Sequence, residues 1–149
     1  MKELSIEEKE LLLKDLCARL PYEVIIKHKD EHGKSIDARL VGYNGDWFNY
    51  YIDDLCFHLK IHEFKPYLRP MSSMTEEEKK ELHSICPHSA FNKTNVPGWI
   101  IGISGSDYGR ISRIDEISKL IDWLNAHHFD YRGLIEKGLA LEASEEMYK

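Results

Sequence analysis

RIDEISKLIDWLNAHHFDYRGLIEKGLAL, residues 113–141, predicts a helix, a tight break and a second short helix. At about 100° per residue, the aliphatic side chains of the first part share one narrow arc, which indicates a helix with one face toward a core. The residues on this arc are Ile114, Ile117, Leu120, Ile121 and Leu124.

The break is predicted at residues 127–130. Asp130 is expected to cap the second helix, with Phe129 and Leu134 meeting in a hydrophobic staple. Gly138 supplies a C-terminal stop. His128 falls on the apolar arc and is expected to be a partly buried, hydrogen-bonded histidine.

Composition limits the class of protein. A chain of 149 residues with 42% hydrophobic content can bury one core, so we expect a single domain over residues 1–149. A net charge of −6 disfavours nucleic acid as a partner, and such a role would need a basic cluster around Arg110, Arg113 and Arg132. No apolar run approaches about 18 residues, so we expect no transmembrane span, and the acidic net charge disfavours an anionic membrane as a partner.

Three widely spaced cysteines, Cys17, Cys56 and Cys86, indicate reduced thiols and a cytoplasmic location. Cys17 belongs to the apolar arc of a helix that opens with a capping box at Ser5 and ends before Pro21. We therefore expect Cys17 to be a small buried residue.

The middle of the chain predicts strands over residues 22–29, 35–40, 46–52 and 56–62. Residues 63–74 and 88–97 are expected to be irregular, with a surface helix opening at Thr75 between them. Residues 98–104 are a further strand that can join the sheet, and residues 142–149 a frayed tail. The fold class is α+β: an antiparallel β-meander of about four strands, or five, with helices at both ends and one surface helix.

Asn44-Gly45 predicts a two-residue hairpin turn, which fixes the register of the flanking strands. Ile36, Ala38, Leu40, Trp47 and Tyr51 then form the core face. The opposite face combines aromatic side chains with charge, which is the composition of an interface: Arg39, Tyr43, Phe48 and Tyr50. The alternative is that the N-terminal helix covers this face.

These observations favour a non-enzymatic protein-interaction or accessory module with a protein partner. The alternative is a small metal- or thiol-dependent enzyme, in which Cys86 pairs with His83 or His88 as an activated nucleophile. Thiolate and imidazole also suit zinc, but no recognised metal-binding spacing is present, so no cofactor is expected. The candidate ligands are Cys56, His58, His62, His83, Cys86 and His88.

Three segments carry a resemblance to a known family: LLLKDLCARLPY (residues 11–22), PYLRPMSSMTEEEKKEL (66–82) and DWLNAHHFDYRGLIEKGLALEA (122–143). They resemble a family of short, uncharacterised proteins from gut anaerobic bacteria, with phage-like or mobile elements as the expected context. The resemblance covers the ends and the middle of the chain, and it implies no activity and no site residues.

Overall fold

The computed structural model describes residues 3–85, 89–93, 99–103 and 110–149, with the backbone alone for 89–93, 99–103 and 110–115. Its elements in chain order are α1 (Ile6–Arg19), η1 (Leu20–Tyr22), β1 (Ile25–Lys29), β2 (Ser35–Tyr43), β3 (Phe48–Ile52), β4 (Leu55–Leu59), β5 (Phe64–Leu68), η2 (Met71–Ser73), α2 (Glu76–Ile85), β6 (Ser89–Lys93), β7 (Trp99–Ile103), α3 (Arg110–Ala126) and β8 (Leu141–Glu142).

The main sheet has six strands in the order β4-β3-β2-β1-β5-β8. All its neighbours are antiparallel except β5 and β8, which run parallel. The α+β class is therefore confirmed, but a pure antiparallel meander of four or five strands was wrong. The strand predicted over residues 98–104 is present as β7, and it pairs with β6 in a separate two-stranded sheet. β6 itself falls where a loop was expected.

The hairpin between β2 and β3 differs from the predicted register. Tyr43 pairs with Phe48 and Leu40 with Tyr50, and an irregularity between Leu40 and Gly42 shifts the ladder. The irregularity places Leu40 instead of Arg39 opposite Tyr50, while Tyr43 and Phe48 share a side as predicted. Phe48 is buried and Trp47 is 37% exposed, so the predicted core face, which included Trp47, was wrong.

The first helix begins and ends as predicted. Ser5 and Glu8 cap it reciprocally, with the Ser5 hydroxyl accepting from the Glu8 N–H and the Glu8 carboxylate accepting from the Ser5 N–H. Its buried side is rotated from the predicted arc, because Asp15 and Arg19 are buried alongside Leu12 and Leu16. Cys17 is exposed, so its predicted burial was wrong.

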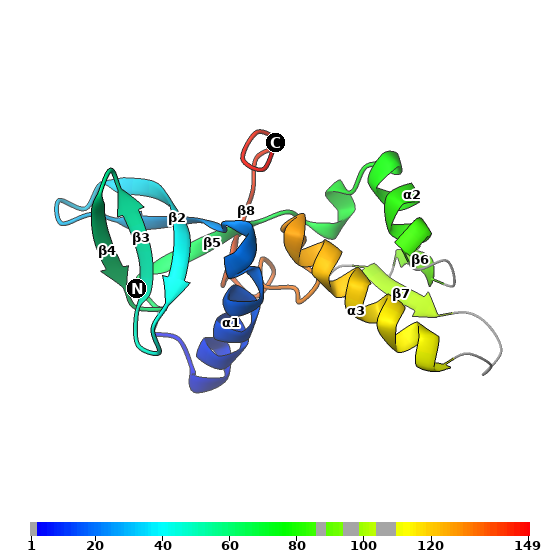
Figure 1. Cartoon of the computed structure of the whole chain (residues 1–149). Helices are drawn as coiled ribbons and strands as arrows, with labels where there is room; N and C mark the ends of the chain where they lie inside the picture. The colour runs from blue at the N-terminus through cyan, green and yellow to red at the C-terminus, as the bar shows by residue number, and fades with distance from the viewer. Residues whose placement is uncertain (1–2, 86–88, 94–98, 104–109) are drawn as a thin grey trace.

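The first hydrophobic cluster lies between α1 and the sheet. It joins Leu12 and Leu16 of α1 to Leu40, Phe48 and Tyr50 of the sheet. Figure 1 shows α1 beside this sheet, while α2, α3 and the β6–β7 hairpin occupy the other end of the molecule. A second cluster there joins α2 and α3 through Leu82, Leu124 and other residues. The expectation of a single domain stays a prediction.

The corner after α3 is not followed by a second helix. Residues 131–138 form turns, because Gly133, inside the expected helix, has a φ of +71°. The Asp130 carboxylate still accepts hydrogen bonds from the Leu134 and Ile135 N–H groups at 2.8 and 2.9 Å. Phe129 and Leu134 belong to different core clusters, so the predicted staple is absent.

The C-terminal residues are docked rather than frayed. β8 extends the sheet, and the Ala143 N–H donates to the Leu68 carbonyl at 2.8 Å. Beyond it, the Tyr148 hydroxyl donates to the Tyr67 carbonyl at 2.7 Å and accepts from the Ile25 N–H at 3.0 Å. Among the helices that the structure describes, none combines the length and the apolar character needed to cross a membrane.

Candidate functional site

The aromatic set predicted to bind a partner is largely part of the core. Phe48 is fully buried and Tyr50 is 4% exposed, both in the cluster that includes α1. Tyr43 is half-buried and stacks on Phe48, with 4.5 Å between ring centroids. Arg39 is exposed and forms an ion pair with Glu23 at 3.2 Å. The alternative prediction, in which the N-terminal helix covers this face, therefore describes the structure. The four predicted residues do not form an open surface.

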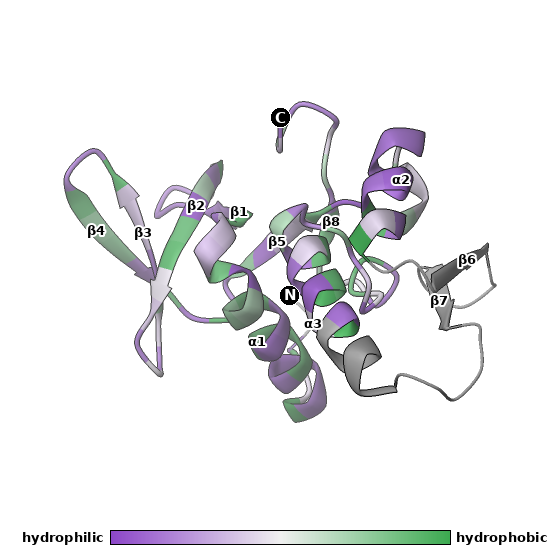
Figure 2. Cartoon of the chain, turned by 45° about the vertical axis from the view of Figure 1, so that its right-hand side comes forward, coloured by the Kyte–Doolittle hydropathy of each residue, from purple (hydrophilic) through white to green (hydrophobic). Residues whose placement is uncertain are grey.

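Exposed apolar side chains lie on both sides of the same hairpins, because Phe57 is the cross-strand partner of the buried Tyr50 and shares its side, whereas Tyr51 lies on the opposite side. Apart from Ile6, every large exposed hydrophobic side chain in the described part of the chain lies between residues 41 and 57. Figure 2 shows hydrophobic stretches on β2 and β4 at this end of the sheet. We call this set of exposed side chains, which lie on both sides of the two hairpins, the hairpin face; its residues are Val41, Trp47, Tyr51, Ile52, Leu55 and Phe57.

Cross-strand pairing positions much of this face. Ile52 lies opposite Leu55, and Tyr51 lies opposite Cys56 across the β3–β4 ladder. Phe57 stacks on the buried Tyr50 at 5.3 Å, so it covers the core with one side of its ring. At the rim, the Lys60 ammonium lies 4.9 Å from the Trp47 ring centroid. Leu55 and Phe57 thus lie on the side of the buried Tyr50, and Tyr51 lies on the opposite side.

The hairpin face continues onto an open edge of the sheet. β4 is the terminal strand of the six, and its sequence LCFHL holds no residue with a permanent charge and no proline. Natural edge strands usually carry lysine, proline or a bulge, which prevent pairing with another chain. β4 lacks these devices, so its free backbone groups remain available to a further strand.

The candidate metal ligands are separated in the fold. Cys56 and His58 lie on β4, His62 follows it, and His83 lies on α2 at the opposite end of the molecule (Figure 1). The His58 Nδ1 is 2.7 Å from the Asn49 Oδ1. Cys86 and His88 lie outside the described residues. Within the described ranges, no group of three or more His, Cys, Asp or Glu side chains could hold a metal ion.

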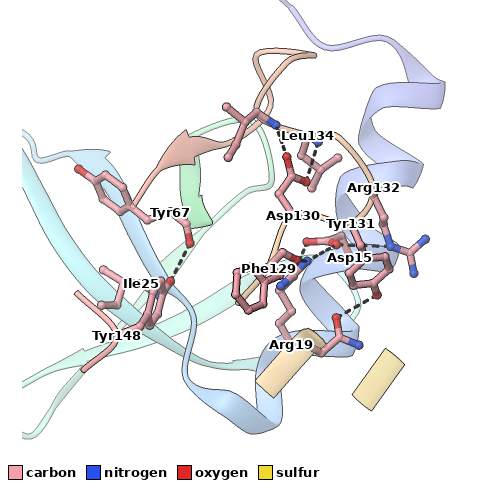
Figure 3. Close-up of polar contacts among 12 residues, drawn as sticks. Asp15, Arg19, Ile25, Tyr67, Phe129, Asp130, Tyr131, Arg132, Leu134 and Tyr148 are labelled. Carbon is pink, nitrogen blue, oxygen red and sulfur yellow. Dashed lines mark hydrogen bonds and ion pairs between the residues drawn. The ribbon is translucent and has the colours of Figure 1, made fainter. Parts of the chain in front are cut away.

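A buried polar junction, which the sequence did not reveal, fixes α1 against the corner after α3 (Figure 3). The Arg19 guanidinium donates to the Asp15 carboxylate at 2.8 and 3.0 Å and to the Phe129 carbonyl at 2.6 Å. Arg132 approaches the same carboxylate at 3.4 Å. The i, i+4 spacing of Asp15 and Arg19 was the available signal, but such pairs are usually exposed.

His128 lies beside this junction and is buried, as predicted. Its ring stacks on Tyr148 with centroids 3.7 Å apart, and its Nδ1 has no hydrogen-bond partner. Burial, followed by the nearby Arg19 charge, lowers the pKa of His128 to about 3. A histidine held neutral in this way is a structural group rather than a proton carrier at neutral pH.

No protein-family model matches the chain, and no curated protein or solved structure is significantly similar to it.

Proposed function

We propose that this chain is a non-enzymatic protein-interaction module of the cytoplasm, which binds a strand of a partner protein along β4 and the hairpin face. The observation that supports this most is the concentration of exposed apolar side chains on one pair of hairpins. In the described residues, Leu55 is 67% exposed and Tyr51 is 55% exposed. Patches of this kind on a monomer commonly mark interaction sites.

The chemistry of the edge defines the partner. A strand added to an exposed sheet edge gains main-chain hydrogen bonds, and its side chains contact those of the host strand. β4 is apolar along its length, with Asp53-Asp54 before it and Lys60 after it. The partner strand is therefore apolar in its centre, with a basic residue near Asp54 and an acidic one near Lys60.

The enzyme alternative has weaker support. It depends on Cys86 and His88, which lie outside the described residues, and on Cys56, which neighbours Tyr51 on the hairpin face. The Tyr51 hydroxyl has its pKa raised first by a hydrogen bond with Cys56, so the thiol belongs to the apolar surface. The resemblance to short proteins of gut anaerobes adds no activity to either proposal.

Site-specific photo-crosslinking tests the interaction. Benzoylphenylalanine replaces Phe57 in one sample and the exposed Glu145 in another, and cross-linked proteins are recovered from a bacterial lysate. The Phe57 sample should yield a specific partner that the Glu145 sample does not. Leu55→Lys should abolish this product, whereas Ile6→Lys, at a side chain 76% exposed outside the hairpins, should not.

Hydrogen exchange on the recovered complex separates strand addition from contact through side chains alone. Strand addition should slow exchange at the outward-directed amides of β4, while the amides of the exposed α1 surface stay unchanged. Equal capture by Leu55→Lys and Ile6→Lys, or unchanged exchange along β4, would contradict the proposal.

A further inference from the structure

The outer edge of β5 is only partly paired. β8 pairs with Tyr67 and Leu68 at the end of β5, and the Ala143 N–H donates to the Leu68 carbonyl at 2.8 Å. Backbone groups alternate in direction along a strand, so the N–H and C=O of Phe64 point to the same side as the Leu68 carbonyl. Among the described residues, no hydrogen bond reaches Phe64 from that side. The first half of β5 is therefore an open sheet edge.

A pocket of about 590 Å³ lies along this open edge. Phe64 and Lys65 of β5 line it on one side, and Lys137, Gly138 and Leu139, which lead toward β8, line it on the other. Its volume lies within the range of ligand sites in proteins. No residue of the hairpin face contributes to the lining, so this site is separate from the one proposed at β4.

The lining comes from both sides of the sheet. Phe64 is on the side that packs against α1, where Leu4 and Leu12 supply apolar surface. Lys65 is on the opposite side, as is its cross-strand partner Lys27. The pocket therefore surrounds the strand edge instead of lying on one face. An extended peptide fits such a slot, because its successive side chains also point to opposite sides of the sheet.

The two sides of the slot differ in charge. On the side away from α1, Lys27 lies between Lys65 of β5 and Asp37 of β2, so two positive charges meet one negative charge. On the α1 side, the border carries the negatively charged carboxylate of Glu8, which accepts from the Ser5 N–H. An acidic side chain of a ligand is thus favoured beside Lys65 and disfavoured beside the leucines.

From the open edge, the two-sided lining and its charges, we infer that this pocket binds an extended peptide as an added antiparallel strand. Directly opposed residues of an antiparallel pair can exchange both hydrogen bonds, and their side chains share a side. The ligand residue opposite Phe64 therefore bonds both open backbone groups and is apolar, since its side chain joins the leucines. The residue before it lies opposite Lys65 and is acidic.

NMR titration of the full chain with acetyl-Glu-Leu-Thr-amide tests this inference. The peptide should shift the Phe64 amide resonance and leave the amides of Cys56 and His58 on β4 unchanged. Serine in place of its leucine should weaken binding about tenfold or more, because the apolar side chain is no longer buried. Methylation of the leucine nitrogen removes the N–H that donates to the Phe64 carbonyl and should weaken binding by a similar factor.

Charge reversal in the protein completes the test. The parent chain should bind the glutamate peptide about threefold more tightly than acetyl-Lys-Leu-Thr-amide, and Lys65→Glu, at an exposed position, should invert this preference. Lys80→Glu makes the same change in charge at an exposed position of α2, so it is the matched control and should keep the preference of the parent.

Three results would overturn the inference: no shift at Phe64, equal binding of the methylated peptide, or a preference that Lys65→Glu does not change. A peptide that shifts the β4 amides instead would also overturn it, because the ligand would then occupy the hairpin face.

Discussion

The ion pair of Asp15 and Arg19 is the most demanding interaction at the scale of single residues. Both side chains are fully buried, and the Arg19 Nη1 has no partner. Removing charges from water is costly, so such a pair is stable only when its geometry is good and its remaining donors are paired. The Phe129 carbonyl accepts from one of these donors, and the Arg132 guanidinium lies 3.4 Å from the Asp15 carboxylate.

Asp15→Asn should destabilise the protein by about 3–5 kcal/mol, because it leaves the buried Arg19 charge without a counter-ion. The free energy of unfolding in urea measures this loss. Glu10→Gln, on the exposed side of the same helix, is the control and should change stability by no more than about 0.5 kcal/mol. An Asp15→Asn variant as stable as the control would show that the pair contributes little.

His128 gives the protein a defined dependence on pH. The folded state has a His128 pKa of about 3, while the unfolded chain has the ordinary value of 6.5. Below that ordinary value the unfolded chain binds a proton that the folded chain does not. The stabilisation is therefore complete above the unfolded pKa and is lost as the pH falls toward the folded one, by about 1.4 kcal/mol per pH unit.

His128→Asn tests this dependence, because asparagine tolerates the φ of +60° found at this position. Between about pH 7 and about pH 5, the parent chain should lose about 2 kcal/mol more stability than the variant. Urea unfolding at both pH values measures the difference. Parallel pH profiles would mean that the pKa of His128 is the same in the folded and unfolded states.

At the scale of elements, the Tyr148 side chain anchors the C-terminal residues beyond β8. Burial raises the pKa of Tyr148 to about 12, and its hydroxyl bridges the Ile25 N–H and the Tyr67 carbonyl. Tyr148→Phe leaves these two backbone groups unpaired and should cost about 1–3 kcal/mol. Exchange of the Ile25 amide should accelerate with it. Lys149→Gln removes only an exposed ion pair with Glu146 and should leave that amide protected.

Elements with strong local signals were predictable from the sequence. The reciprocal caps at Ser5 and Thr75 determine where α1 and α2 begin, and both form in the structure. The end of α3 was also predictable in position. It is closed by hydrogen bonds from Phe129 N–H to the Leu124 carbonyl and from His128 N–H to the Asn125 carbonyl, with His128 in the place usually taken by glycine.

Elements that depend on distant partners were not predictable. β5 contains Pro66, which normally argues against a strand, yet β5 lies between β1 and β8 within the sheet. β8 has two residues and exists only because β5 is beside it. The bulge between Leu40 and Gly42 likewise has no local signature. It placed Leu40 instead of Arg39 opposite Tyr50, so the sequence grouped the aromatic residues of this side correctly but assigned them the wrong neighbours on β2.

At the scale of the whole molecule, the two hydrophobic clusters are joined by few connections. Arg69 is central to them: its guanidinium forms an ion pair with Glu78 at 2.7 Å and lies 4.1 Å from the Phe129 ring centroid. The backbone N–H of Arg69 donates to the His128 carbonyl, and the backbone carbonyl of Arg69 accepts from the Asp130 N–H. Arg69 thus links α2, the corner after α3 and the end of β5.

The whole molecule also presents β4 as an open edge, and β4 has the chemistry proposed for its own partner. The two-residue turn between β3 and β4 places Ile52 opposite Leu55. It therefore directs the backbone N–H and C=O groups of Leu55 and Phe57 toward β3. Those of Cys56 and His58 then point outward. In an antiparallel pair of two β4 strands centred on Phe57, Asp54 of each copy lies opposite Lys60 of the other.

This register predicts a dimer that forms at high protein concentration and is weakened by salt. Sedimentation equilibrium of the parent chain should show monomer and dimer, and Asp54→Lys should shift the equilibrium to monomer by placing two lysines opposite each other. Adding Lys60→Asp to that variant restores opposite charges and should restore the dimer. Asp30→Lys, in the turn after β1, is the control and should dimerise like the parent. A chain that stays monomeric at all concentrations would leave β4 to strands of other proteins, and a dimer insensitive to both charge reversals would rule out this register.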